Sequence, residues 1–372
     1  MRRIAIVLVL LGLVSCTRAA EDLDLARLKL PPDFHIGIFA QAPHARFMTF
    51  TPAGVLLVTD TTDGTVLAFS DPQHTGHAAR TVTVLDDLNA PHGIALYQGK
   101  LYVAETNRVR SYDWNEAELK ATNPHMLTAL PGSGMHFTRT VLIHDNRMLV
   151  SVGSDCNVCV ESDPLRATVL SFNLDGGGQS IYGKGLRNAV GLAVNPRTKT
   201  VWATVNGRDW LGDDLPPDMV VDLGKGGGHF GWPYCYGKGI VDPANKAEGE
   251  KICPTTTPPV VEIPAHSAPL GLGFYDGSMF PAQYRGNLFI ALHGSWNRSV
   301  LHGYKVVMVK LGPDGKPQGG LEDFITGWIK PGELKNGPRM GRPAGIAVGP
   351  DGAMYVSDDT AGVVYRVTYG KN

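Results

Sequence analysis

The chain has 372 residues, of which 43% are hydrophobic and 19% are charged, and its formal net charge is −1. A chain of this length can bury a large core, in one large domain or in two ordinary ones. Because the net charge is so small, the chain lacks the bulk field that draws nucleic acid or an anionic membrane surface, and we expect no nucleic-acid partner.

The first residues have the pattern of an export signal. A positively charged start precedes an apolar stretch, 4–14, that is too short to span a bilayer. The sequence LVSC at 13–16 resembles a bacterial lipobox, which predicts lipidation of Cys16; a plain secretory signal with a chance cysteine is the alternative. We therefore expect a signal peptide (1–15), a tether (16–30), and an exported, periplasmic protein that a lipid anchors to a bacterial membrane.

The rest of the chain, 31–372, repeats one pattern six times: a short apolar run, a turn rich in Pro, Asn, Asp and Gly, and a second apolar run. The copies are FTPAGVLLVTD from Phe50, IALYQGKLYVAE from Ile94, VLIHDNRMLVSVG from Val141, LAVNPRTKTVWATV from Leu192, LGFYDGSMFPAQYRGNLFIALHG from Leu272 and IAVGPDGAMYVSDD from Ile346. Such repeats, at irregular spacings of roughly 40–80 residues, are typical of β-propeller blades. The sequence therefore predicts an all-β fold, a six-bladed β-propeller.

Two segments complete this prediction. The isolated strand Phe34–Phe39 near the amino end is expected to join the final blade, beside the strands at 353–357 and 363–368, so that the ring has no open edge. The long segment 206–267 is rich in Gly and Pro and has little periodicity. Loops of this length are usually functional when they are ordered, so we predict a cap or wall over one face of the propeller.

Four cysteines remain after Cys16, which is an even number in a chain with an export signal and suggests disulfides. Cys235 and Cys253 would close a loop of intermediate length, and Cys156 and Cys159 could form a tight bridge. A redox CxxC motif or a zinc site is the alternative, but the sequence has neither a second CxxC nor a thioredoxin-like βαβ pattern.

Four arginines each precede an inner strand of the predicted propeller: Arg46, Arg139, Arg187 and Arg342. We expect their guanidinium groups to converge near the axis, where they repel one another unless an anion lies between them. A planar polycarboxylate or a phosphate would suit them, because guanidinium binds carboxylate with two parallel hydrogen bonds. Pairing of each arginine with a neighbouring acid or a loop carbonyl is the alternative, but acidic residues do not accompany the four at matching positions.

Several motifs resemble those of the pyrroloquinoline quinone (PQQ)-dependent sugar dehydrogenases, over about residues 31–370. They are HFTR at 136–139, SVGS at 151–154, LRNAVGL at 186–192 and GHFGWP at 228–233. Two further stretches, 206–218 and His293–Arg298, are more similar to the pyranose and sorbosone dehydrogenase branch of that family.

The resemblance implies a six-bladed propeller that holds PQQ and Ca²⁺ on its axis and oxidises a sugar, with electrons leaving to a periplasmic acceptor. His136 would be the general base, and Arg187 would polarise the quinone oxygen. The backbone carbonyls of Gly207 and Arg208 would contribute to the Ca²⁺ site. The remaining residues would hold the cofactor: Asn188 at its edge, Trp296 stacked on it with Asn297 and Arg298 beside it, and Arg46, Arg139 and Arg342 on its carboxylates.

The chain also departs from the family pattern. Gly153-Ser154 stands where the glucose enzymes have Gly-Asp, Ala344 stands where they have a second arginine, and the metal loop reads Asn206–Asp209. Two other functions therefore stay open. One is a propeller without cofactor that binds a sugar or an envelope protein. The other is a lactonase-type hydrolase with an axial metal, whose candidate ligands are Asp60, Glu105, Asn188 and Asp209.

Overall fold

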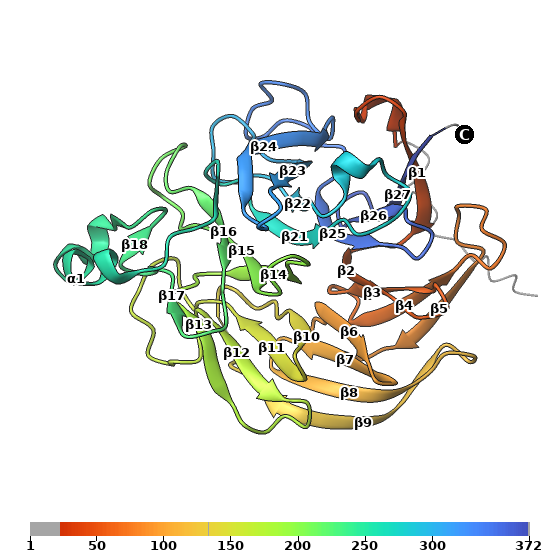
Figure 1. Ribbon diagram of the computed structural model, residues 1–372, viewed down its shortest axis with the longest axis horizontal. Helices are drawn as coiled ribbons and strands as arrows, with labels where there is room; N and C mark the ends of the chain where they lie inside the picture. The colour runs from red at the N-terminus through yellow and green to blue at the C-terminus, as the bar shows by residue number, and fades with distance from the viewer. Residues whose placement is uncertain (1–22, 133, 371–372) are drawn as a thin grey trace, which may run out of the picture.

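The computed structural model describes residues 23–132 and 134–370. Six antiparallel sheets surround one axis and form a six-bladed β-propeller, as predicted (Figure 1). The proposed signal peptide and Cys16 lie outside the described residues. Within the described part of the chain, no helix is both long and apolar enough to span a bilayer.

Each blade has four main strands, and each predicted repeat forms the hairpin between the inner and the second strand. The inner strands are β2 (Ala45–Phe50), β6 (Gly93–Tyr97), β10 (Val141–His144), β14 (Ala189–Val194), β21 (Pro269–Phe274) and β25 (Pro343–Val348). The second strands are β3 (Leu56–Asp60), β7 (Lys100–Glu105), β11 (Arg147–Val152), β15 (Val201–Val205), β22 (Leu288–Leu292) and β26 (Met354–Asp358).

Two outer strands complete each blade. The third strands are β4 (Thr65–Ser70), β8 (Arg108–Asn115), β12 (Thr168–Asn173), β16 (Asp218–Asp222), β23 (Lys305–Leu311) and β27 (Val363–Tyr369). The outermost are β5 (Arg80–Leu85), β9 (Lys120–Ala129), β13 (Ser180–Lys184), β20 (Val261–Ile263), β24 (Pro317–Ile325) and β1 (Phe34–Gln41). β1 pairs antiparallel with β27, from Phe34 opposite Tyr369 to Gln41 opposite Val363. The two ends of the chain therefore close the ring in one blade, as predicted.

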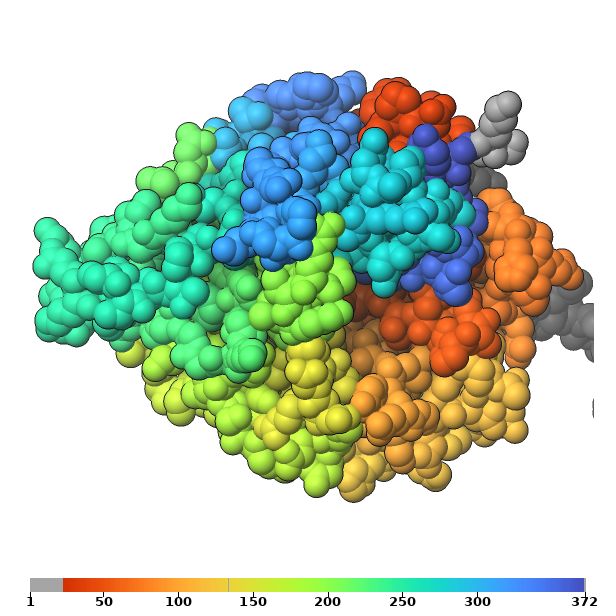
Figure 2. All heavy atoms as spheres, viewed as in Figure 1, coloured from red at the N-terminus to blue at the C-terminus, as the bar shows by residue number. Residues whose placement is uncertain are grey.

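Apolar contacts between the blades form the core. Each pair of neighbouring blades shares its own cluster; in the cluster between the fourth and fifth blades, Trp202 meets Phe274 edge to face at 5.6 Å. Val190, Leu270 and Ala344 form a further small cluster with Phe47, contributed by four different inner strands. Apolar side chains therefore fill part of the axis, and the coloured sectors meet around the centre of the face in Figure 2.

Glycines let the inner strands approach one another closely. A Cβ on Gly191 would lie 2.3 Å from the carbonyl oxygen of Leu270, and one on Gly345 would lie 2.4 Å from that of Arg46. Equivalent positions of neighbouring inner strands thus meet, so the inner strands begin at the same end of the axis. The antiparallel second strands finish at that end. Residues before an inner strand or after a second strand therefore gather there, although they are far apart in sequence.

The segment 206–267, predicted as a cap or wall, divides between three places. β16 and β20 are strands of the fourth blade, which the sequence analysis missed because they are short and lie among Gly and Pro. β17 (Gly228–His229) extends the third blade by pairing parallel with β13. The part with β18 (Cys235–Tyr236), β19 (Ile240–Val241) and α1 (Lys246–Ile252) projects from the rim of the ring (Figures 1 and 2).

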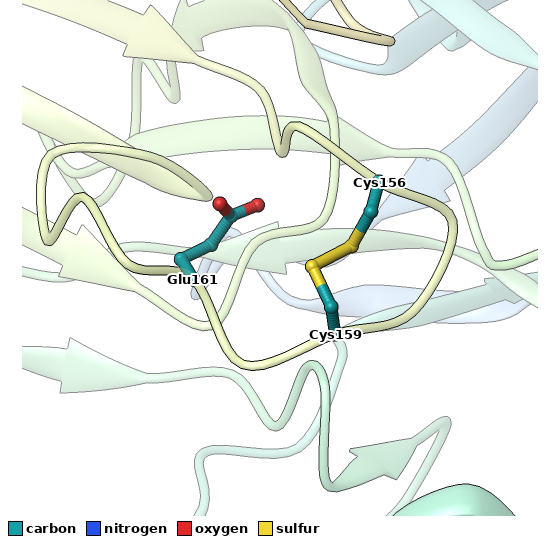
Figure 3. Close-up of side chains that lie close together, drawn as sticks. All are labelled: Cys156, Cys159 and Glu161. Carbon is teal, nitrogen blue, oxygen red and sulfur yellow. A yellow bond between two sulfur atoms is a disulfide. The ribbon is translucent and has the colours of Figure 1, made fainter.

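Both expected disulfides are present. Cys235 is joined to Cys253 in the projecting part, and Cys156 is joined to Cys159 in the loop after β11 (Figure 3). Of the proposed tether, the structure describes the residues from 23 onward. There Leu28 is buried, and Lys29 exchanges backbone hydrogen bonds with Thr326, the residue after β24. These last residues before the propeller pack against its fifth blade.

Candidate active site

Polar side chains gather at the end of the axis where the inner strands begin. They fall into two groups. The Asp359 side consists of Arg46, His293, Arg342 and Asp359. The His136 side consists of His136, Arg187, Asn188, Asp209 and Asn297. Each side combines residues of different blades, which the ring brings together.

Asp359 is the centre of its side. Its carboxylate accepts a hydrogen bond from Arg46 Nη1 at 2.5 Å and one from His293 Nε2 at 2.9 Å. His293 follows β22, Asp359 follows β26 and Arg46 lies in β2, so three neighbouring blades contribute. Because the histidine uses Nε2–H to bond the carboxylate, this nitrogen has no lone pair for proton abstraction.

Arg342, just before β25, bonds to backbone instead of an acid. Its Nε and Nη2 donate to the carbonyl oxygens of His293 and Gly294 at 3.0 and 2.6 Å, and its guanidinium lies over the ring of Tyr304, 5.5 Å from the centroid. Carbonyl oxygens and an aromatic face do not neutralise a guanidinium. Arg342 therefore contributes a full positive charge to this side.

Burial and nearby charges set the protonation of this group. Burial outweighs the pull of Asp359 and lowers the pKa of His293 to about 4. Burial also acts to raise the pKa of Asp359, but hydrogen bonding from His293 and the charge of Arg46 hold it below its usual range. At neutral pH the side carries two guanidinium charges and one carboxylate, which leaves one excess positive charge.

On the other side, the contacts of Ser154 orient His136. Its Nδ1 lies 3.0 Å from the carbonyl oxygen and 2.9 Å from the hydroxyl oxygen of Ser154, and that hydroxyl itself donates to the carbonyl of Cys156 at 2.7 Å. Both neighbours of Nδ1 thus accept, so Nδ1 carries the proton and Nε2 keeps its lone pair. Burial, followed by the charge of Arg187, lowers the pKa of His136 to about 3, so the imidazole is neutral at neutral pH.

Gly153 allows this arrangement. A Cβ at this position would lie 2.5 Å from Cβ of His136 and 2.9 Å from Oδ1 of Asn188. Both side chains therefore pack directly against the glycine backbone. Ser154 thus orients His136 through its hydroxyl and carbonyl groups, a role that the resemblance had assigned to an aspartate.

Arg187, two residues before β14, is buried and makes four hydrogen bonds. Its Nη2 donates to Asp209 Oδ2 and to Asn157 Oδ1, both at 2.9 Å, its Nη1 donates to the carbonyl of Gly207 at 2.6 Å, and its Nε donates to the carbonyl of Asn157 at 3.0 Å. Of its five N–H groups, one on Nη1 has no partner among the described residues. The other Asp209 oxygen accepts from Asn297 Nδ2 at 3.2 Å.

These pairs correct the expectation that no acids accompany the arginines. Asp359 pairs with Arg46 and Asp209 pairs with Arg187, but each acid comes from a different blade or loop, so no local pattern reveals it. The Asp359 side nevertheless suits an added anion. It has an excess positive charge, and Nε of Arg46 is buried without a hydrogen-bond partner among the residues that the structure describes. A buried donor of this kind is costly unless a ligand accepts from it.

Comparison with known proteins identifies the family. A family model described as TrAA12-like matches residues 29–370. The chain belongs to the TrAA12-like family. An uncharacterised protein of Borreliella burgdorferi is 31% identical to it over 376 residues, which cover 96% of this chain and 94% of that protein. A PQQ-dependent pyranose dehydrogenase of Coprinopsis cinerea is 27% identical over 355 residues, which cover 78% of this chain and 48% of that enzyme. The match thus spans about half the length of the Coprinopsis enzyme.

Solved structures agree with this relationship. The PQQ domain of the Coprinopsis cinerea pyranose dehydrogenase, in its holo form, matches with a TM-score of 0.80 at 25% identity and covers 92% of this chain and 97% of that one. A Trichoderma reesei structure of family AA12 has a TM-score of 0.80 at 22% identity and covers 96% and 100% of the two chains, which supports the fold.

Arg139, predicted to hold a cofactor carboxylate, and the side chain of Arg208, whose carbonyl was predicted as a metal ligand, both have partners within this TrAA12-like protein. Arg139 is 0% exposed and donates to the backbone carbonyls of Pro131, His136 and Thr138, so it supports the loop that carries His136. Arg208 pairs with Asp242 at 2.8 Å, which joins the site loop to the projecting part.

Trp296, the aromatic residue of the predicted site, is exposed. Trp296 is 52% exposed and meets Trp210, which is 62% exposed, edge to face at 5.4 Å. Arg298 bonds to the carbonyl of Asp213 and to the carboxylate of Asp214, so the loop after β22 is tied to the loop after β15. Trp210 was not among the predicted site residues, because its exposure beside the site becomes visible only in the structure.

One of the two proposed metal ligands has another partner. The carbonyl of Gly207 accepts from the Arg187 guanidinium, which would repel a cation at the same oxygen. In this arrangement the Gly207 carbonyl therefore does not fit a Ca²⁺ ion. The lactonase-type ligand set is not assembled either: the groups of three or more His, Cys, Asp and Glu side chains close enough to share one ion, among residues 23–132 and 134–370, contain neither Glu105 nor Asp209.

Proposed function

We propose that this protein is a PQQ-dependent dehydrogenase that oxidises the C1 hydroxyl of an aldose, a pyranose or a sorbosone-like sugar. The observation that carries the proposal is that the same end of the axis holds both a base and an anion site. His136 is neutral and has a free Nε2 lone pair, and the Asp359 side has an excess positive charge. The family, and a relative named for PQQ and pyranose, support the same chemistry.

The arginines of the Asp359 side would hold PQQ. PQQ has three carboxylates, and Arg46 and Arg342 supply charge that the protein's own acids leave unbalanced. When bound, PQQ would supply a quinone that accepts a hydride, and with it two electrons, from the sugar. Asn188 and Trp296 would lie against the cofactor, with Asn297 and Arg298 beside it.

The His136 side would carry the chemistry. His136 Nε2 takes the proton of the sugar hydroxyl, and its Nδ1–H stays fixed on Ser154 throughout. Arg187 stabilises the negative charge that develops during the oxidation, through the N–H that no described residue occupies. A bound anion near Arg187 would also offset the charge that depresses the pKa of His136, which would make the histidine a stronger base.

Three further elements belong to the proposal. Ca²⁺ dependence follows from the family resemblance and requires a site other than the Gly207 carbonyl as it stands. The electrons leave to a periplasmic acceptor, and the lipid on Cys16 holds the protein at the membrane.

A spectral titration tests the proposal. We expect purified protein to shift the absorbance of added PQQ, and the mixture to reduce an artificial dye when a pyranose is supplied. Protein without PQQ serves as the control. If PQQ shows no absorbance change on mixing, while a sugar still binds by calorimetry, the protein is a binding module and the redox assignment is wrong.

A further inference from the structure

The loop after β11 contains a four-residue ring, Cys156–Cys159, closed by a disulfide with a Cα–Cα distance of 6.2 Å (Figure 3). A ring this short removes little chain entropy from the unfolded state, in contrast to the longer loop of Cys235 and Cys253. Its main effect is therefore local. Both cysteines are partly exposed. Asn157, which lies between them, points toward Arg187 of the candidate site.

Asn157 bonds to Arg187 and Asp209 through both its backbone and its side chain. Its Oδ1 accepts from Arg187 Nη2 at 2.9 Å and from the amide of Asp209 at 2.7 Å, which uses both lone pairs. Its Nδ2 donates to the carbonyl of Asp209 at 3.1 Å. Its carbonyl accepts from Arg187 Nε at 3.0 Å and from Trp232 Nε1 at 3.3 Å. One residue thus contacts both members of the Arg187–Asp209 pair.

The same ring also contacts Ser154, the residue that orients His136. The Ser154 hydroxyl donates to the carbonyl of Cys156, and this bond orients the hydroxyl so that it accepts from His136. The backbone of the ring therefore connects to His136 through Ser154 and to Arg187 through Asn157.

We propose that Asn157, held in place by the Cys156–Cys159 disulfide, is a positioning residue for Arg187 and Asp209. This inference rests on the proposed function. Without the side chain of Asn157, Arg187 loses one of its four bonds and the Asp209 amide loses its acceptor. Misplacement of a catalytic group by about 1 Å can cost on the order of a hundredfold in rate.

The test compares Asn157→Ala with Val158→Ala, a truncation in the same ring at a residue outside these contacts. We expect Asn157→Ala to lower kcat with PQQ and sugar by roughly tenfold to a hundredfold while the sugar KM stays within about threefold. Val158→Ala should stay within about twofold of wild type in both. Retention of kcat by Asn157→Ala would overturn the inference.

A second readout needs no cofactor. Hydrogen exchange is followed by mass spectrometry in the peptide that contains the Asp209 amide. This peptide should exchange faster in Asn157→Ala than in wild type, and at the wild-type rate in Val158→Ala. If kcat falls while this exchange stays at the wild-type rate, Asn157 does not act by positioning Asp209. If wild type itself oxidises no sugar with PQQ, the proposed function fails, and the exchange result alone decides the positioning.

A Cys156→Ser/Cys159→Ser variant covers the case in which Asn157→Ala does not fold. It should lower kcat and speed the same exchange. Dithiothreitol breaks the S–S bond to give two thiols and is itself oxidised to a cyclic disulfide. Because dithiothreitol can also reduce the Cys235–Cys253 disulfide, wild type and variant are both treated with it and compared by exchange without cofactor, where the Asp209 amide should then exchange at the same rate in both. Wild-type kcat and exchange in the variant would show that the ring plays no such role.

Discussion

The two sides of the axial site use the same residue types in opposite ways. Each has an arginine, an aspartate and a histidine, but His293 is bound through Nε2 to Asp359, whereas His136 is bound through Nδ1 to Ser154. The Asp359 side keeps a positive charge and a buried, unpartnered donor among the described residues. On the His136 side, Arg187 is matched by Asp209. The difference indicates that one side holds an anion and the other moves a proton.

The sharpest way to break this comparison is to remove the base. We expect His136→Gln to lower kcat by about 10²- to 10⁴-fold, because glutamine cannot accept the proton, while PQQ binding by spectral titration changes little. The matched control is His144→Gln at the far end of β10, which should keep wild-type activity. If His293→Gln rather than His136→Gln abolishes turnover without loss of PQQ, the roles of the two sides are reversed.

The second prediction concerns the anion. Arg46→Gln should raise the Kd for PQQ by about 10- to 100-fold, since charge-assisted hydrogen bonds contribute about 1.5–3 kcal/mol. Arg366→Gln also breaks an arginine–aspartate pair, with Asp351 at 2.8 Å, but it lies outside both groups and serves as the control. Adding Asp359→Asn to Arg46→Gln removes the carboxylate left without its partner. Unchanged PQQ affinity in Arg46→Gln and in the double variant would contradict an anion-binding role for the Asp359 side.

The fold was predictable from local pattern, whereas the contacts of the site were only partly so. Alternating apolar residues mark each hairpin, and the strand at Phe34 needed a partner that only the carboxyl end could supply. The arginines before the inner strands were visible for the same reason. The partner of Arg46 could not be predicted, because Asp359 lies 313 residues away in the sequence. Nor did the sequence show that Ser154 holds His136, since this depends on where the serine hydroxyl donates.

A third prediction tests the state of His136 without cofactor. An unfolded histidine binds a proton below about pH 6.5, but folded His136 does so only near pH 3, so acid favours the unfolded chain over this window. At pH 5 the penalty is about 2 kcal/mol. His136→Asn should therefore lose about 2 kcal/mol less unfolding free energy than wild type between pH 7 and pH 5, measured by denaturant titration. Equal losses would show that His136 is not held neutral.

The smallest effect should come from the rim of the His136 side. Aromatic contacts contribute about 0.5–1.5 kcal/mol, so Trp296→Ala should raise the Kd for PQQ by about two- to tenfold, less than Arg46→Gln does. Trp210→Ala, which removes the ring that packs on Trp296, should have a still smaller effect, because the stacking face itself is kept. Titrating both variants with PQQ and then with sugar separates two roles. If Trp296→Ala changes only the sugar KM, the tryptophan contacts the substrate, and the cofactor is held by the Asp359 side without it.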